Sequence, residues 1–151
     1  MIYGQPDFSL HLEGFFPAAG ENVTLSCIDP GVDSPGFSNK WRQSWLRVSW
    51  TALPNHVDPS KIITVALVDS GDDGVTFASG AAATTADGRP YFLPTIEVLI
   101  PGVANGAPAG FSDFPWPPGL RGPVGILVTV PVGTGDLTSI ACLLSATVFF
   151  G

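Results

Sequence analysis

Charged residues are scarce in this sequence of 151 residues. Lysine, arginine, aspartate and glutamate together make up 13% of the chain, whereas an average globular domain holds about 25%. Only 6 of them are basic and 13 are acidic, so the formal net charge is −7. A balance this acidic argues against the usual basic kind of nucleic-acid-binding domain. So little charge on a folded domain also indicates that partners cover part of its surface.

Long apolar runs are lacking too. No stretch reaches the ~18 uninterrupted apolar residues that span a membrane, so we expect no membrane partner. The opening residues MIYGQPDF have neither the basic nor the apolar region of a signal peptide. The two cysteines, Cys27 and Cys142, lie far apart with no CxxC motif. We expect both to be buried free thiols, since a disulfide would require secretion or a special geometry.

Motifs of common catalytic sites are missing as well. The chain has no GxSxG elbow, no HExxH pair and no phosphate-binding P-loop. Its two histidines stand apart, His11 on the polar face of a predicted strand and His56 in a turn, and we expect each to be solvated and structural. The prediction is therefore no catalytic residue, no enzyme and no cofactor, apart from the divalent cation considered below.

Glycine and proline, in contrast, are abundant, with 18 and 15 residues spread along the chain. Their scatter is typical of many short strands separated by turns and argues against a helical protein. With 151 residues and 45% apolar composition, the chain is long enough to bury a core of its own. We expect a single domain over residues 1–151, with a short N-terminal segment, 1–7, and no basic arm.

Alternation of apolar and polar residues predicts the strands. In the stretch SWLRVSW, Leu46, Val48 and Trp50 would share one face, and Arg47 and Ser49 the other. Alternating or continuous apolar runs predict strands over 8–15, 21–29, 46–52, 62–68, 95–100, 124–132 and 137–151, and a short one over 75–79.

Three further segments have other patterns. SNKWRQSW, residues 38–45, favours one short helix. The proline- and glycine-rich segment 102–123 is expected to be a long ordered excursion. GTGD, residues 133–136, is a tight-turn signal compatible with a hairpin between the last two strands.

These elements predict an all-β fold. About eight antiparallel strands and long loops suit a two-sheet jelly-roll sandwich with one short helix. An immunoglobulin-like sandwich is the alternative.

One cluster of basic residues stands out. Lys40, Arg42 and Arg47 are half of the basic residues and lie within eight consecutive positions, 40–47. They form either a solvated helix face or a small cationic patch that faces phosphate or an acidic neighbour.

An acidic cluster follows the strand at 62–68. Asp69, Asp72 and Asp73 in DSGDDG could chelate calcium through closely spaced carboxylates. Their spacing differs from that of an EF-hand loop, and acidic turns at strand ends are common, so no metal site is firmly predicted.

Aromatic residues gather in GFSDFPWPPG. Phe111, Phe114 and Trp116 could form a surface that stacks on sugar rings. The alternative is a loop held in place by aromatic–proline packing.

The order of the segments resembles the single jelly-roll coat proteins of small icosahedral RNA viruses, nearest to the tymovirus-like group. The resemblance spans residues 8–150 and rests on the succession VTLSCID, NKWRQSWLRVSWTALP, ITVALVDSGDD, TFASGA, PTIEVLIPG, VGILVTVPV and TSIACLLSATVFF. It implies a structural protein whose copies assemble into a closed shell around RNA, located in the virion and, during assembly, in the host cytoplasm.

This resemblance also suggests roles for the clusters. Many such coat proteins carry a basic N-terminal arm, but no basic residue precedes Lys40 here. Contact with viral RNA would then be weak and would fall to Lys40, Arg42 and Arg47. Asp69, Asp72 and Asp73 would meet a basic side chain of a neighbouring copy or share a divalent cation at a subunit boundary. The alternative function is a projecting or spike β-sandwich module that binds carbohydrate or a receptor.

Overall fold

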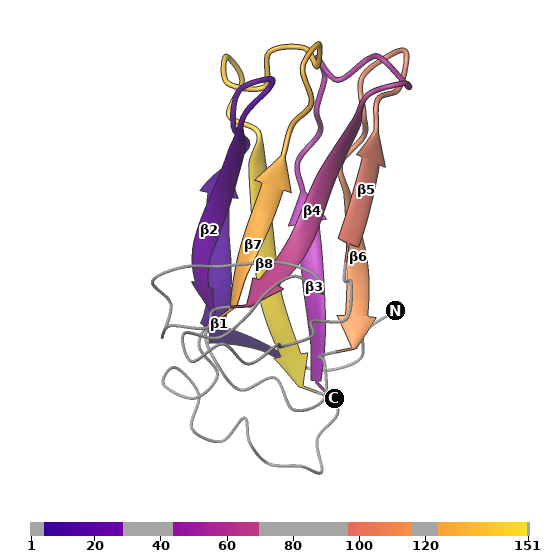
Figure 1. Ribbon diagram of the computed structural model, residues 1–151. Helices are drawn as coiled ribbons and strands as arrows, with labels where there is room; N and C mark the ends of the chain where they lie inside the picture. The colour runs from indigo at the N-terminus through magenta and orange to yellow at the C-terminus, as the bar shows by residue number, and fades with distance from the viewer. Residues whose placement is uncertain (1–4, 29–43, 70–96, 116–123, 151) are drawn as a thin grey trace, which may run out of the picture.

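The computed structural model describes residues 5–28, 44–69, 97–115 and 124–150, and all the regular structure in these ranges is β-strand (Figure 1). The eight strands are β1 (Gln5–Phe15), β2 (Asn22–Ile28), β3 (Ser44–Trp50), β4 (Ile62–Asp69), β5 (Glu97–Pro101), β6 (Gly110–Pro115), β7 (Val124–Thr129) and β8 (Leu143–Phe150). In the described ranges, no helix is long and apolar enough to cross a membrane.

The strands form two antiparallel sheets of four. Sheet A has the order β1-β8-β3-β6 and sheet B the order β2-β7-β4-β5. The pairs β1–β8, β2–β7, β3–β6 and β4–β5 are those of one long hairpin folded at its middle. The pairs β3–β8 and β4–β7 then close that hairpin into two sheets. This order is that of a jelly roll, and the predicted fold class is confirmed.

The core lies between the sheets because one side of each strand is apolar. Leu46 and Val48 from β3, and Ile63 and Val65 from β4, are almost completely buried there. Strand β5 alternates in the same way between exposed and buried positions. The core also holds Cys142 as a free thiol whose pKa is raised by burial. The prediction for this cysteine is confirmed, whereas the side chain of Cys27 lies outside the described residues.

Two local predictions were wrong. Residues 110–115, within the predicted excursion, form β6 at the edge of sheet A. Its one proline, Pro115, is the last residue of this edge strand, where a missing N–H does little harm to the ladder. The turn signal at 133–136 does not close a hairpin, because β7 and β8 belong to different sheets and the loop 130–142 crosses between them.

Two other predicted elements fall mostly outside the described residues. The short strand at 75–79 lies outside them entirely. So does the predicted helix at 38–45 except for Ser44 and Trp45, which begin β3.

Four connections meet at one end of the sandwich, the upper end in Figure 1: loops 16–21, 51–61, 102–109 and 130–142. Loop 51–61 is in close backbone contact with two of the others. A Cβ atom on Gly102 would overlap the backbone of Asp58, and one on Gly135 would overlap the carbonyl oxygen of Asn55. Glycine at these two positions lets the three loops pack together.

His56, in the middle of this loop packing, is fully buried. Its Nε2–H donates a hydrogen bond to the backbone oxygen of Ile100 at 2.8 Å, and its Nδ1 has no partner in the described part of the chain. The prediction of a solvated histidine was wrong because the turn around His56 looks polar in sequence. Its burial comes from contacts with residues more than 40 positions away.

Asp136, at the same end, predicts an acid sensitivity. Hydrogen bonds from the Thr138 hydroxyl, the Thr138 N–H and Ser139 lower the pKa of its carboxyl to about 2. In the unfolded chain an aspartate titrates at about 3.9. The folded state therefore favours the ionised form, and this contribution to stability is complete above about pH 4 and lost as the pH falls to about 2.

We expect Asp136→Asn to reduce this acid sensitivity. The variant should fold at neutral pH, but its free energy of unfolding should fall less steeply than that of the natural sequence between about pH 4 and pH 2. Urea unfolding at several pH values measures both slopes. Identical slopes would show that Asp136 makes no such contribution.

Candidate functional site

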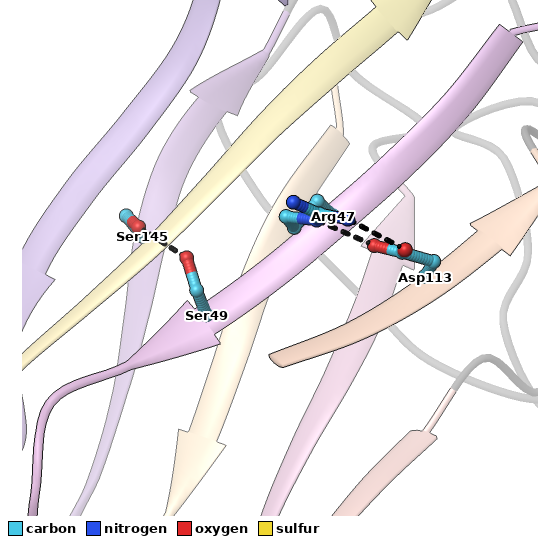
Figure 2. A network of polar contacts seen from close by, with 4 residues as sticks. All are labelled: Arg47, Ser49, Asp113 and Ser145. Atoms are coloured by element: carbon cyan, nitrogen blue, oxygen red, sulfur yellow. Dashed lines mark hydrogen bonds and ion pairs between the residues drawn. The ribbon is translucent and has the colours of Figure 1, made fainter. Parts of the chain in front are cut away.

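The outer face of sheet A carries a network of polar side chains from β3, β6 and β8 (Figure 2). The alternation of side chains along β3 explains this position: Leu46 and Val48 are buried in the core, so Arg47 and Ser49 point to the outer face. The position of Arg47 on the polar face is thus what the alternation predicted.

Arg47 forms an ion pair with Asp113. The register sets Arg47 opposite Asp113 on β6, and Figure 2 shows both bonds of the fork: Nε to Oδ1 at 2.7 Å and Nη2 to Oδ2 at 2.9 Å. The side chains keep only 28% and 12% of their surface exposed, so water screens this pair less than an ordinary surface pair. The hydrogen bond to Asp113 raises the pKa of Arg47, and the two charges cancel.

Aromatic rings complete the surroundings of Arg47. Its guanidinium carbon lies 4.2 Å from the centre of the Phe111 ring and 5.4 Å from that of Phe149. Both distances are in the range of cation–π contacts. Arg47 thereby holds one exposed ring, Phe111, in a fixed place on the surface.

Beside this group lies a shallow hollow of about 240 Å³. Among its lining residues, the hydroxyls of Ser49 and Ser145, on neighbouring strands, lie 2.9 Å apart (Figure 2). The hollow is lined by Glu13, Ser49, Trp50, Thr51, Leu143 and Ser145. Its chemistry is that of hydroxyls, one carboxylate and an indole ring, which suits a neutral polar ligand.

Of the three basic residues predicted to act together, the structure describes one. Lys40 and Arg42 lie outside the described residues. Arg47 makes its bidentate bonds within the chain, to Asp113. Contact of the three with RNA or a neighbouring subunit stays a prediction.

The acidic cluster cannot be placed as a group. Asp69 is the last residue of β4, but its side chain, Asp72 and Asp73 lie outside the described residues. Among the side chains that the structure does describe, no three His, Cys, Asp or Glu residues are grouped to hold a metal ion. A cation at a subunit boundary stays a prediction.

The predicted aromatic surface is not one surface. Phe111 is 57% exposed and lies on the outer face of β6. Phe114 packs against the core instead, because residues three apart on a strand face opposite sides. Trp116 lies outside the described residues.

Asp113, Phe149 and Ser145 were not singled out from the sequence. Phe111 and Asp113 are two apart, so recognising β6 would have placed both on one face. The pairing of Asp113 with Arg47 joins residues 66 positions apart, and no local pattern reveals it.

The ion pair gives a prediction for stability. Arg47→Ala should lower the free energy of unfolding by about 2 kcal/mol, because the Asp113 carboxylate loses both charged donors in a poorly hydrated place. Arg47→Lys should be intermediate, since an ammonium cannot reproduce the fork. Arg47→Ala combined with Asp113→Ala should cost less than the sum of the single changes, by about 1 kcal/mol. Urea unfolding measures the natural sequence, Arg47→Lys, the two single alanine variants and the double variant, and additive losses would contradict the coupling.

No protein-family model, curated protein or solved structure matches the chain.

Proposed function

We propose that this protein is a structural coat protein, which assembles with copies of itself into an icosahedral viral shell around RNA. The strand order carries this proposal: two four-stranded sheets ordered β1-β8-β3-β6 and β2-β7-β4-β5 make a jelly roll, an architecture that viral capsid subunits use. The order of segments in the sequence, similar to that of tymovirus-like coat proteins, supports the same function. The proposal places the protein in the virion and assigns it no catalytic role.

The small share of charged residues, 13% of the chain, favours permanent association. Permanent interfaces resemble a domain core and are depleted in charge. On the outer face of sheet A, Arg47 and Asp113 neutralise each other, so that face too adds little net charge.

RNA would be held weakly by each copy. The net charge is −7 and Arg47 is paired within the chain, which leaves Lys40 and Arg42 as the close pair of basic residues proposed for phosphate contact. Two neutralised phosphates correspond to a log–log salt slope of only about −1.4 for single strands. Packaging would then depend on many copies acting together.

Sedimentation velocity tests the assembly, and absorbance of the sedimented particle tests the RNA. The purified protein should sediment as a megadalton particle with a nucleic-acid absorbance. Lys40→Gln combined with Arg42→Gln should leave the particle assembled but lower its ratio of nucleic-acid to protein absorbance; Arg47 is kept because it supports the fold. A monomer or dimer under all conditions would contradict the coat function, and an unchanged ratio would contradict the RNA contact.

Sedimentation velocity also tests whether the acidic cluster takes part in assembly. If Asp69, Asp72 and Asp73 share a cation between subunits, a chelator at raised pH should loosen the particles, since uncompensated carboxylates repel. Unchanged sedimentation would remove the cluster from the assembly.

The hollow on sheet A favours a second candidate, a projecting module that binds carbohydrate. The hydroxyls of Ser49 and Ser145 could donate hydrogen bonds to a sugar and accept them from it, and the carboxylate of Glu13 could accept them. The exposed ring of Phe111 lies in the same row of side chains. Titration with a panel of oligosaccharides, followed by the tryptophan fluorescence to which Trp50 at the hollow contributes, tests this function. A monomer that binds one of them would support the module over the coat, and no response to any member of the panel would contradict the module.

A further inference from the structure

The outer face of sheet B is almost free of charge. In the described part of the chain this face consists of the side chains that alternate with the core-facing ones. These are Asn22 and Thr24 of β2, Leu127 and Thr129 of β7, Ile62, Thr64 and Ala66 of β4, and Glu97, Leu99 and Pro101 of β5. Glu97 is the one charged residue in this set.

Two large apolar side chains adjoin one another on this face. Thr64 stands opposite Leu99 and Ile62 opposite Pro101, so Ile62 and Leu99 are diagonal neighbours on adjacent strands. They are 43% and 56% exposed. We call Ile62 and Leu99 the β4–β5 patch.

The loops that adjoin β4 and β5 also carry exposed apolar side chains. Val57 and Val103 are 46% and 43% exposed, and the N–H of Val103 donates to the backbone oxygen of His56, which joins the two loops. Removing such side chains from water contributes about 25 cal/mol for each Å² buried. Adjacent exposed apolar residues on a rigid sheet are therefore a favourable place for association.

Charge decides which partner fits. A phosphate-bearing partner, whether RNA or an anionic lipid surface, would find no lysine or arginine in the described set on this face. Copies of the chain, each with a net charge of −7, repel one another, and this repulsion is smallest where they meet through surfaces that carry little charge. The outer face of sheet B is such a surface.

The edge strand of sheet B bears on how a partner can dock. Strand β5 lies at the edge of sheet B and ends in Pro101, which has no N–H to donate to an added strand. Pro101 therefore disfavours extension of the sheet at this end and favours a partner that packs on its face.

We propose that the β4–β5 patch is a face-to-face contact between two copies of this chain, in which each copy buries Ile62 and Leu99 against sheet B of the other. This inference rests on the proposed coat function, since a shell requires contacts between copies, and it names the residues that make one of them. A twofold contact of this kind uses the same surface on both copies.

Glutamate substitutions test the contact. Leu99→Glu and Ile62→Glu each place one carboxylate per copy in an apolar interface, where it is desolvated and faces its symmetry mate. Each should raise the protein concentration needed for half-maximal association at least about tenfold, which corresponds to about 1.4 kcal/mol. Sedimentation velocity over a range of concentrations measures this shift, and circular dichroism should show an unchanged fold because both positions are exposed.

Phe15→Glu is the matched control. Phe15 is 66% exposed at the end of β1 in sheet A, so the same kind of change there should leave association unaltered. If all three variants associate like the natural sequence, or if Phe15→Glu weakens association as much as the other two, the proposed contact is wrong while the coat function stands. If the natural sequence itself stays monomeric at every concentration, both are wrong.

Discussion

Leu46→Ala is expected to lower the free energy of unfolding by about 3 kcal/mol. Leu46 is fully buried in β3, which lies between β8 and β6 in sheet A. Truncating its side chain to a methyl group forfeits the transfer of three carbon atoms from water and leaves a cavity between two sheets that are held apart by the neighbouring side chains. Urea unfolding followed by circular dichroism measures the loss.

Leu99→Ala is the control for this change. It deletes the same atoms at a position that is 56% exposed, so in the monomer it should alter the free energy of unfolding by no more than about 0.5 kcal/mol. Equal losses of unfolding free energy at the two positions would contradict the burial of Leu46 in the core.

Gly102→Ala should be comparably damaging, for a different reason. A Cβ atom at this position would overlap three backbone atoms of Asp58. That backbone cannot easily move, because the Asp58 oxygen accepts from the Lys61 N–H and the Gly102 N–H donates to the Lys61 oxygen. We expect a loss of about 3 kcal/mol, at the upper end of the usual cost of overpacking.

Gly133→Ala separates steric overlap from backbone conformation. Its Cβ would meet only the flexible end of Lys61, but its φ is 86°, so the expected cost is about 1 kcal/mol from the left-handed conformation alone. Thermal and urea unfolding of both variants give the comparison. A smaller loss of unfolding free energy for Gly102→Ala than for Gly133→Ala would contradict the tight packing of loop 51–61.

Periodicity was enough to predict most of the strands. Leu46 and Val48 alternate with Arg47 and Ser49, and this pattern correctly assigned one face of β3 to the core and the other to the surface. The same reasoning failed for β6, because the prolines and glycines around it are typical of loops and only pairing with β3 reveals a strand.

Long-range contacts account for what periodicity missed in the candidate site. The face of Arg47 follows from alternation, but its partner Asp113 lies 66 residues away and is brought opposite by the register of two strands. His56 likewise has a polar, turn-like neighbourhood in the sequence, yet contact with Ile100 buries it. Burial of this kind depends on how the loops meet at the end of the sandwich, and sequence alone does not show that.

Electron microscopy of the purified protein in negative stain tests the coat function most directly. We expect closed particles of uniform diameter, because a jelly-roll subunit with a sheet face that carries little charge is proposed to form repeated contacts with its own copies. The Leu99→Glu variant, prepared at the same concentration, should show fewer closed particles. A field that contains only isolated molecules or pairs, at low and high salt and with and without divalent cations, would contradict the claim that this protein builds a shell.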